Sequence, residues 1–544
     1  MSTQDLARQE AERKLPASEI ARQWWQVAIR TADAVLVSAW TVPILVGVGI
    51  LLRIVRYASD RSLWLDESYL ALNLSTRSYS DLVGTLDFNQ GAPVGFLVLE
   101  KAMVQAFGNG EHILRLLPFL VGCASVLLFV VVARDLLTRR AVPIALLLFA
   151  VLDPFVYYSA EAKQYGFDVF ATLVLLALFH RALRRSGSSR WFAAFGVAGV
   201  AAPWFSHPSV FLLAGMGVVA IALALRDRDS RKVARWVVTG ALWLVSFGVE
   251  WVLSIRHLHQ LQATVTGGTG DGHGSTSRHV LKGLYLMFSV PGELPRTVVG
   301  VTALLTVAGA YVVARRRPAV VGAIVLGTLA LLVAGDLHRY PVGQRFILFL
   351  MPVAVLLIAA CATELVTLAR GGLGLAIAAV VAAMIFVPAL AKALPRFVDP
   401  PDSEPTRQLL ADLQARWHAG DTLYLFQNSQ YAFRYYLTCD GCNSRARSER
   451  ALWPFRAIHG PAQTAPAVES QSPALVVGSG GSDQLADYRR DLGGLAGKQR
   501  VWLLFTHYYP LDLESLTTPL NARGTQLAAI RRGSAVLYLY DFDR

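Results

Sequence analysis

Long apolar segments constrain the fold of this 544-residue chain more than any other feature. Its hydrophobic residues cluster in runs of about 18 to 22, the length at which a helix crosses the roughly 30 Å of hydrocarbon in a bilayer. A mean hydropathy of +0.43 agrees with this pattern, because ordinary water-soluble domains are more polar. The chain is therefore predicted to be a polytopic α-helical membrane protein.

Eleven transmembrane helices are predicted from these runs. They lie near residues 35–55, 113–133, 141–158, 166–183, 191–206, 208–225, 236–255, 297–314, 319–335, 346–368 and 373–391. Residues 1–33 are polar and mixed in charge, and they include no short apolar core followed by a small-residue cleavage site. We expect this segment to remain on the protein and not to be a cleaved signal.

Basic residues in the short loops predict the orientation. Clusters of Lys and Arg at 139–140, 180–190, 226–235 and 315–317 fall in alternate loops, on one common face. Such clusters are retained in the cytoplasm, so the N-terminal segment is expected there and the protein in the inner (plasma) membrane. The net charge of +13 then reflects topology, and a nucleic-acid partner is not predicted.

Two parts of the chain are predicted to lie outside the membrane on the opposite, extracytoplasmic face. The loop 56–112 contains two segments with helical apolar spacing, which we expect to lie along the membrane surface. Residues 396–544 alternate between strand-like and helix-like segments, which predicts a small α/β domain with its own core. Residues 34–395 would then form the transmembrane domain.

The four cysteines fall into two groups. Cys123 and Cys361 lie in apolar spans and are expected to be packing residues. Cys439 and Cys442 form the sequence CDGC in the predicted external domain, where a local disulfide is favoured by the oxidising compartment. A redox-active CxxC is the alternative, although no thioredoxin-like pattern precedes it, and no second cysteine pair completes a zinc site.

An acidic pair lies in the stretch RSLWLDESYLALN (61–73), at a predicted membrane boundary. Asp66 and Glu67 would be costly in ionised form at such a place without a role. Adjacent carboxylates repel, so that one can have a raised pKa suited to a general base. Asp66 is the predicted base, and Glu67 either shares the proton or holds the loop. The alternative is that the pair only caps a helix lying at the interface.

Further polar residues are predicted on the same face. They are Glu161, Lys163, His207, Arg339 and Arg345. The two arginines flank a Tyr-Pro turn and could bind phosphate oxygens, or could anchor to lipid headgroups. Lys163 could also serve a phosphate or be solvated beside Glu161. His207 could bind an acceptor or form a hydrogen bond at a helix end.

The glycine-rich stretch 264–277 is predicted to be a mobile lid over a substrate cavity. No strand precedes it and no Lys-Ser/Thr follows, so it does not match a phosphate-binding loop. The neighbouring histidines at 257, 259, 273 and 279 match no metal-ligand spacing. No metal site and no cofactor are predicted, and a divalent cation remains an open alternative.

Four motifs together resemble those of the type C glycosyltransferases. They are LWLDESYLALN, DFNQGAPVGFLVLEK, YYSAEAKQYGFD and HRYPVGQRFILFLMP. The resemblance covers residues 35–395 and is to the bacterial branch with dolichyl-phosphate-mannose-protein-mannosyltransferase-like and lipid A aminoarabinose transferase-like proteins. It implies transfer of a hexose or pentose from a polyprenyl-phosphate donor to a glycan, lipid or protein acceptor outside the cell. It also implies that Gln90, Tyr165 and Tyr340 are among the substrate-binding residues.

The sequence departs from the lipid A branch at one turn. Where those enzymes carry Glu-Lys before the proline, this chain has Asn89-Gln90-Gly91-Ala92-Pro93, so the resemblance leaves a metal or phosphate role at that turn open. Two other functions also suit a chain with many spans. A transporter or flippase of lipid-linked sugars would usually show internal repeats or charged mid-membrane helices, which are not evident. A receptor would not need eleven spans, so a glycosyltransferase is the predicted function.

Overall fold

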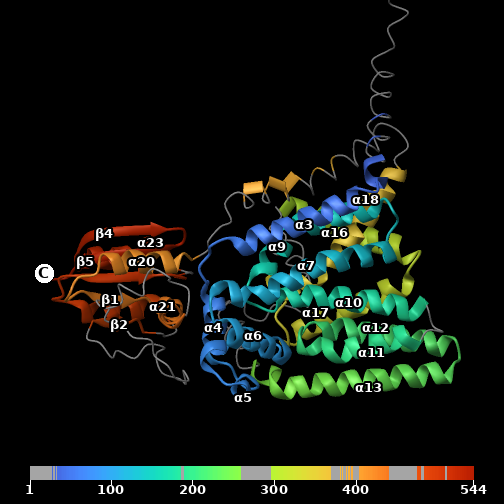
Figure 1. The fold of residues 1–544 in the computed structure, drawn as a ribbon, viewed down its shortest axis with the longest axis horizontal. Coiled ribbons are helices and arrows are strands. Elements are labelled where there is room, and N and C mark those ends of the chain that lie inside the picture. The colour runs from blue at the N-terminus through green and yellow to red at the C-terminus, as the bar shows by residue number, and fades with distance from the viewer. Residues whose placement is uncertain are drawn as a thin grey trace, which may run out of the picture.

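The computed structural model describes residues 34–184, 189–258, 296–342, 344–368, 404–439, 474–479, 483–508 and 511–543, with isolated positions near 27–31 and 380–395. A helical bundle is followed by a smaller region built on a five-stranded sheet (Figure 1). The predicted span 373–391, the lid 264–277 and the boundary near residue 396 fall outside the described segments.

The bundle consists mainly of long helices that run side by side (Figure 1). They are α3 (Thr41–Ala58), α7 (Glu111–Leu136), α8 (Ala141–Val151), α9 (Asp153–Tyr157), α10 (Tyr165–Arg184), α11 (Ser189–Ala201), α12 (Ser209–Arg226), α13 (Ser230–Leu253), α16 (Arg296–Ala314), α17 (Pro318–Asp336) and α18 (Met351–Leu368). In the described residues, seven segments are long and apolar enough to cross a membrane, or eight if the bent pair α8 and α9 is one span. The predicted helical membrane fold is confirmed.

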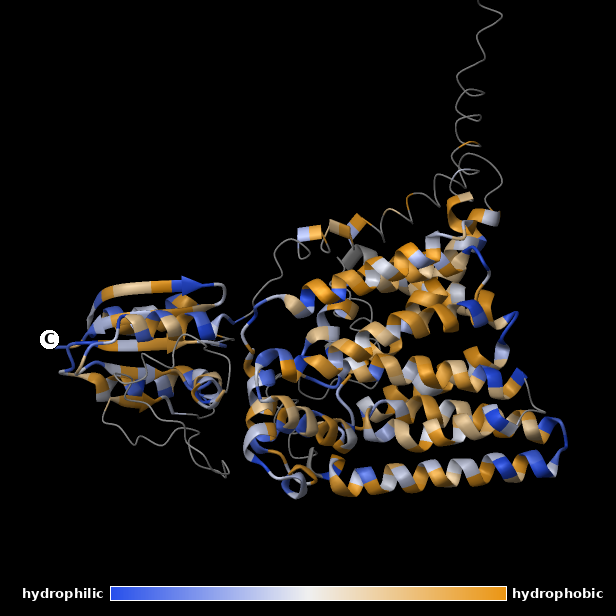
Figure 2. Ribbon diagram, in the orientation of Figure 1, coloured by the Kyte–Doolittle hydropathy of each residue, from blue (hydrophilic) through white to orange (hydrophobic). Residues whose placement is uncertain are grey.

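The outside of the bundle is apolar along the length of its helices (Figure 2). Large side chains such as Leu244 and Val245 of α13 and Leu304 and Val307 of α16 are exposed. A continuous apolar surface of this kind is unfavourable in water and favourable against lipid tails. The two ends of the bundle are more polar, as expected where helices leave the hydrocarbon.

A break between α8 and α9 positions a functional loop. Leu152 is extended, with ψ 124°, and Pro154 opens α9, where its missing N–H costs nothing. The two helices are bent by 61°. The 3₁₀ turn η2 (Tyr158–Ala160) then packs against α7 at Gly122, where an added Cβ would lie 2.4 Å from Ser159 Cβ. Only glycine allows this approach, which brings the loop 161–164 close to α7.

Three short helices lie at the end of the bundle that faces the sheet region (Figure 1). They are α4 (Leu65–Thr76), α5 (Tyr79–Leu82) and α6 (Val94–Phe107), with the 3₁₀ turn η1 (Asp87–Asn89) between α5 and α6. The two predicted surface helices correspond to α4 and α6. Pro93 precedes α6 as expected for a residue with a fixed φ.

The C-terminal region folds around a mixed sheet in the order β2-β1-β3-β5-β4. The strands are β1 (Thr422–Leu425), β2 (Leu475–Val477), β3 (Val501–Phe505), β4 (Thr525–Arg532) and β5 (Ala535–Asp541), and the helices are α20 (Thr406–Ala415), α21 (Ser429–Thr438), α22 (Gln484–Asp491) and α23 (Leu513–Asn521). The first three strands are parallel, and β5 runs antiparallel to β3 and β4. Strand β4 was not predicted, because its polar sequence TQLAAIRR has mostly exposed side chains.

The sheet region shares a hydrophobic cluster with the surface helices. Leu70 and Leu74 of α4 and Phe96 of α6 belong to the same buried cluster as Phe433 and Tyr435 of α21. The contact between α21 and α4 is the main one between the two regions. The C-terminal region is therefore docked through a continuous apolar core and not only tethered by a linker.

The cysteines follow the predicted division where the structure describes them. Cys123 and Cys361 are free thiols in α7 and α18. Cys439, directly after α21, is disulfide-bonded. Cys442, its predicted partner, lies outside the described residues.

Candidate active site

The first turn of α4 carries the acidic pair. Trp64 precedes the helix in an extended conformation, and Asp66 and Glu67 follow where the helix dipole favours negative charge. Successive residues of a helix point about 100° apart, so the two carboxylates face different neighbours. Glu67 is fully buried, whereas 17% of the Asp66 side chain is exposed.

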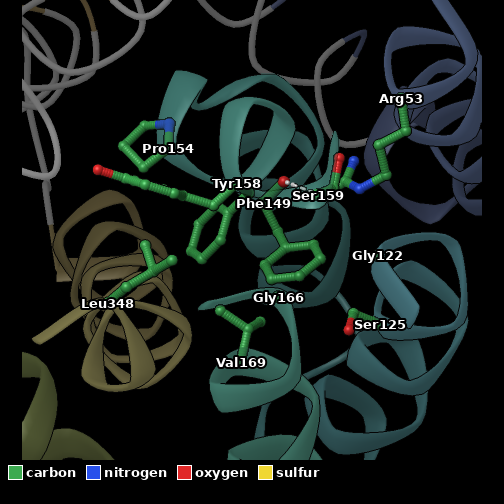
Figure 3. Close-up of a pocket in the computed structure, with 11 residues that line it drawn as sticks. Arg53, Gly122, Ser125, Phe149, Pro154, Tyr158, Ser159, Gly166, Val169 and Leu348 are labelled. Carbon is green, nitrogen blue, oxygen red and sulfur yellow. Dashed lines mark hydrogen bonds between the residues drawn. The ribbon is translucent and has the colours of Figure 1, made fainter. Parts of the chain in front are cut away.

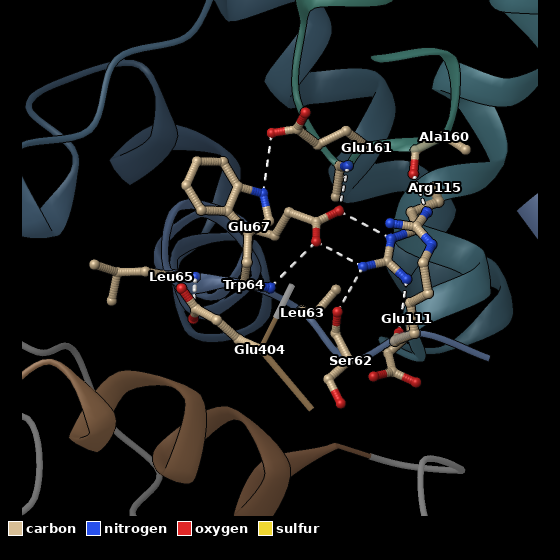
Figure 4. Close-up of polar contacts among 12 residues, drawn as sticks. Ser62, Leu63, Trp64, Leu65, Glu67, Glu111, Arg115, Ala160, Glu161 and Glu404 are labelled. Carbon is tan, nitrogen blue, oxygen red and sulfur yellow. Dashed lines mark hydrogen bonds and ion pairs between the residues drawn. The ribbon is translucent and has the colours of Figure 1, made fainter. Parts of the chain in front are cut away.

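Glu67 lies at the centre of a buried hydrogen-bond network (Figure 4). Arg115 of α7 donates from Nε to Oε1 at 2.9 Å and from a terminal nitrogen to Oε2 at 2.6 Å. The backbone N–H groups of Trp64 and Ala162 donate to the same carboxylate. Burial disfavours its charge, but Arg115 and Arg61 hold the pKa of Glu67 below its usual value. All four acceptor positions are occupied, which supports the expected role of holding the loop.

Asp66 forms an ion pair with Arg345 at 2.5 Å. The guanidinium carbon of Arg345 lies 5.3 Å from the centre of the Trp64 ring, 5.6 Å from that of Tyr165 and 5.5 Å from that of Phe346. Its Nε is buried without a hydrogen-bond partner in the described part of the chain, and 24% of the side chain is exposed. Three aromatic rings thus hold a cation that still has a donor to offer.

Glu161 lies beside the indole nitrogen of Trp64 (Figure 4). Its Oε1 accepts a hydrogen bond from Trp64 Nε1 at 3.1 Å, and Oε2 has no partner among the described residues. Burial, with the charges of Glu67 and Asp66, raises the pKa of Glu161 to about 8. Glu161 is therefore mostly neutral at pH 7 and can donate a hydrogen bond.

Lys163 joins the site to the turn before α6. Its Nζ donates to Gln90 Oε1 at 2.6 Å, and burial lowers the pKa of the ammonium. The turn itself is tight, because Phe88 and Asn89 have φ values of 60° and 55°. The sequence predicted Gln90 and Lys163 separately as substrate-binding residues, and the structure brings them into contact.

The C-terminal region contributes two residues that sequence reasoning missed. Glu404 Oε1 pairs with His507 Nδ1 at 2.7 Å, and Oε2 accepts from the backbone N–H of Leu65 at 3.1 Å. The His507 ring lies 6.4 Å from the Trp64 ring. The available signal was the position of His507 just after the buried strand VWLLF, because sites gather at the carboxyl ends of parallel strands.

His207 belongs to a second group, around the start of α6. Its Nε2 lies 3.2 Å from Oε1 of Glu250, a buried carboxylate of α13. The same oxygen accepts from the N–H of Val94, so Glu250 caps α6. In the described structure no hydrogen bond links His207 to Asp66, and its helix-end role is the better supported of the two expected.

Tyr340 and Arg339 differ in their relation to the site. Tyr340 donates from its hydroxyl to the carbonyl of Phe346 at 3.1 Å and so supports the segment that carries Arg345. Arg339 is exposed, and its side chain forms no ion pair with any acidic residue that the structure describes. Of the two predicted arginines, only Arg345 joins the acidic pair, and Arg339 fits the lipid-anchor alternative.

A small cavity lies behind the site, between α7, α8 and α10 (Figure 3). It has room for about one water molecule. Tyr158 lines the cavity and also packs edge-on against Tyr165 at 5.3 Å. Tyr158 therefore contacts both the cavity and one of the aromatic residues around Arg345.

No cluster of three or more metal-ligating side chains occurs in the described parts of the chain. The candidate site thus contains the buried Glu67–Arg115 pair and the partly exposed Asp66–Arg345 pair. A neutral Glu161, the buried Lys163 and the Glu404–His507 pair complete it. Carboxylates and cations so arranged suit deprotonation of a hydroxyl beside an anionic leaving group.

Comparisons with known proteins agree with this fold. A family model described as dolichyl-phosphate-mannose-protein mannosyltransferase matches residues 91–251. ArnT from Cupriavidus metallidurans in the apo state aligns with a TM-score of 0.52 at 14% identity, over 92% of this chain and 98% of that one. ArnT bound to undecaprenyl phosphate aligns over the same shares, with a TM-score of 0.50 at 14% identity. No curated protein sequence matches the chain.

An oligosaccharyltransferase from Archaeoglobus fulgidus aligns with a TM-score of 0.47 at 13% identity, over 73% of this chain. The chain spans about 61% of that protein's length. The fold is that of a type C membrane glycosyltransferase, as the sequence motifs predicted. Residues 91–251 are similar to the dolichyl-phosphate-mannose-protein mannosyltransferase family, as the family model shows.

Proposed function

We propose that this protein transfers a sugar from a polyprenyl-phosphate donor to a hydroxyl group of an acceptor on the extracytoplasmic face of the membrane. The observation that carries the proposal is the Asp66–Arg345 pair, a carboxylate and an arginine in contact at a partly exposed position. The reaction needs both: a base for the acceptor and a cation for the leaving phosphate.

Asp66 is the proposed general base. The acceptor hydroxyl would lose its proton to a carboxylate oxygen of Asp66 as its own oxygen bonds to the sugar C1. The bond between C1 and the phosphate oxygen breaks in the same step, and the electron pair leaves with polyprenyl phosphate. Attack from the side opposite the phosphate would invert the configuration at C1.

Arg345 is the proposed phosphate-binding residue. It has an unused Nε–H beside the Asp66 pair, and a donor phosphate could occupy that position first. The leaving monoester gains negative charge, so the interaction strengthens during the reaction. As the guanidinium moves toward the phosphate, Asp66 is released to act as a base. Lys163 adds a second cation, and neutral Glu161 adds a hydrogen-bond donor.

Glu67 is proposed to be a positioning residue and not a second base. Its carboxylate holds α4 to α7 and to the loop 161–164, and it has no free acceptor position. Gln90 orients Lys163, and Tyr340 supports the Arg345 segment. These residues bring the reacting groups together without contacting the bond that breaks.

The ArnT structure bound to undecaprenyl phosphate suggests the probe for a direct test. Purified protein in nanodiscs is incubated with a panel of labelled undecaprenyl-phosphate sugars and an extract of envelope acceptors, and free undecaprenyl phosphate is measured. We expect release with at least one donor and none from Asp66→Asn. Movement of intact donor across a vesicle membrane, without release, would instead support the flippase alternative.

A further inference from the structure

The loop after β3 holds His507 in a strained conformation beside the candidate site. Its φ of 47° lies in the left-handed region, which costs a non-glycine residue about 1 kcal/mol or more. The conformation is fixed from two sides, because Asn428 donates to the His507 carbonyl at 2.9 Å and Glu404 binds the ring. Strained residues of this kind cluster at ligand-binding and catalytic sites.

Glu404 determines which nitrogen of the ring is available. A carboxylate accepts hydrogen bonds and does not donate them. The ring nitrogen Nδ1 therefore carries a hydrogen and donates it in a hydrogen bond to Glu404 Oε1 at 2.7 Å. In the neutral ring Nε2 is then a hydrogen-bond acceptor. Because 30% of the His507 side chain is exposed, a ligand can reach it.

The pair is fixed to the acidic turn of α4. Glu404 Oε2 accepts from the N–H of Leu65, the residue directly before Asp66. The His507 ring lies 6.4 Å from the Trp64 ring, and Arg345 lies 5.3 Å from the same ring. His507 and Arg345 therefore both border Trp64, two residues before the proposed base.

Three groups at this turn accept hydrogen bonds: the carboxylates of Asp66 and Glu404, and Nε2 of His507 in its neutral form. A molecule that binds to all three must supply several hydrogen-bond donors close together. A carbohydrate has hydroxyl groups on adjacent carbons, whereas a peptide backbone has one N–H group per residue. This favours a carbohydrate over a protein as the acceptor.

Building on the function proposed above, we propose that His507, oriented by Glu404, binds the acceptor as a polyhydroxylated glycan. Nε2 accepts a hydrogen bond from a hydroxyl next to the one that attacks C1, while Asp66 takes the proton of the attacking hydroxyl. The C-terminal region thus supplies part of the acceptor site, and His507 is a specificity residue and not the base.

The test compares binding and transfer in the full-length protein. The probe for binding is the labelled glycan pool released from bacterial envelopes by mild acid, and the probe for the donor side is undecaprenyl phosphate. For His507→Ala we expect about 10-fold weaker glycan binding and a matching rise in the acceptor KM, with undecaprenyl phosphate affinity changed less than 2-fold. Glu404→Gln should weaken glycan binding less, because the ring loses its orientation but remains present.

Arg407→Gln is the matched control for docking. Arg407 pairs with Glu111 of α7 and so joins the same two regions without reaching Trp64. This variant should lower thermal stability and leave glycan affinity within about 2-fold of wild type. Equal losses of glycan affinity in His507→Ala and Arg407→Gln would reduce His507 to a docking residue and overturn the proposal.

The pH dependence gives a readout that docking alone would not change. Burial and the nearby charge of Arg345 both lower the pKa of His507. The hydrogen bond to Glu404 and the negative charges of Glu404 and Asp66 raise it more, so the pKa of His507 lies above its usual value. Below that pKa, Nε2 is protonated, so glycan binding should fall as the pH drops, and His507→Gln should remove this fall. Wild-type protein that binds no glycan overturns the inference, whereas glycan binding without undecaprenyl phosphate release contradicts only the proposed transfer reaction.

Discussion

Asp66 and Glu67 are neighbours in one helical turn, yet their ion pairs lie in two different environments, one in the interior and one near the surface. The Glu67–Arg115 pair is buried, and its carboxylate has every acceptor position filled. The Asp66–Arg345 pair is partly exposed, and Nε of Arg345 has no hydrogen-bond partner among the residues that the structure describes. Complete satisfaction makes a charge pair part of the fold, whereas an incomplete set of partners leaves it able to bind and react.

The largest effect should come from the buried pair. Glu67→Gln leaves the Arg115 charge buried without its partner and should lower the free energy of unfolding by about 3–5 kcal/mol. Thermal unfolding in detergent and the yield of monodisperse protein would measure this loss. Asp66→Asn, at the neighbouring position, should change stability by less than about 1 kcal/mol. Similar losses in both variants would contradict the distinction between the two pairs.

The exposed pair should control turnover. Asp66→Asn keeps the size of the side chain but removes the basic oxygen, so single-turnover transfer should slow by about 100-fold or more. Binding of undecaprenyl phosphate should stay close to normal or become tighter, because Arg345 is no longer held by a carboxylate. Wild-type turnover in this variant would transfer the role of base to Glu161.

Arg345 should affect donor binding as well as rate. Arg345→Ala removes a charge that we expect to contact phosphate before and during the reaction, so undecaprenyl phosphate should bind about 10-fold more weakly. Arg339→Ala is the matched control, because Arg339 is exposed and outside the site. Equal affinities for the two variants would assign Arg345 to a structural role.

Glu161 should produce the smallest effect, visible in the pH profile. Its pKa near 8 means that the neutral form, which can donate a hydrogen bond, is lost as the pH rises through about 8. Transfer should then fall a few-fold above pH 8. Because the folded protein holds this proton more tightly than the unfolded chain does, the free energy of unfolding should also decrease as the pH rises from about 4.5 to 8. Glu161→Gln stays neutral, so its rate should be flat from pH 7 to 9, and a profile identical to wild type would exclude this role.

The fold was largely predictable because lipid imposes a simple length rule on apolar segments. The pattern predicted ten spans at positions where the structure has helices, and it predicted the two surface helices α4 and α6. It did not reveal the break at Leu152 or the close approach at Gly122, since both depend on packing between helices. Strand β4 was missed because its polar side chains are ordered by pairing with β5 and not by burial.

The candidate site was predictable in its parts but not in its pairing. Charges at a membrane boundary identified Asp66, Glu161, Lys163 and Arg345, because such groups need a reason to be there. The sequence could not tell that Asp66 faces Arg345 while Glu67 faces Arg115, since partners come from helices far apart in the chain. His507 was missed for the same reason, because Trp64 lies more than 400 residues earlier and the partner Glu404 is 103 residues away.

The order of the sheet has a consequence for how the protein is made. The strand β5 lies between β3 and β4, so the central part of the sheet is completed only after residues 535–541 have been synthesised. His507 follows β3 directly, and that strand pairs with β1 on one side and gains its second neighbour only when β5 is in place. During translation and membrane insertion, the helices that carry Asp66 and the segment that carries Arg345 are made before this part of the sheet. The surroundings of Trp64 are therefore completed in two steps, first from the bundle and then from the C-terminal region.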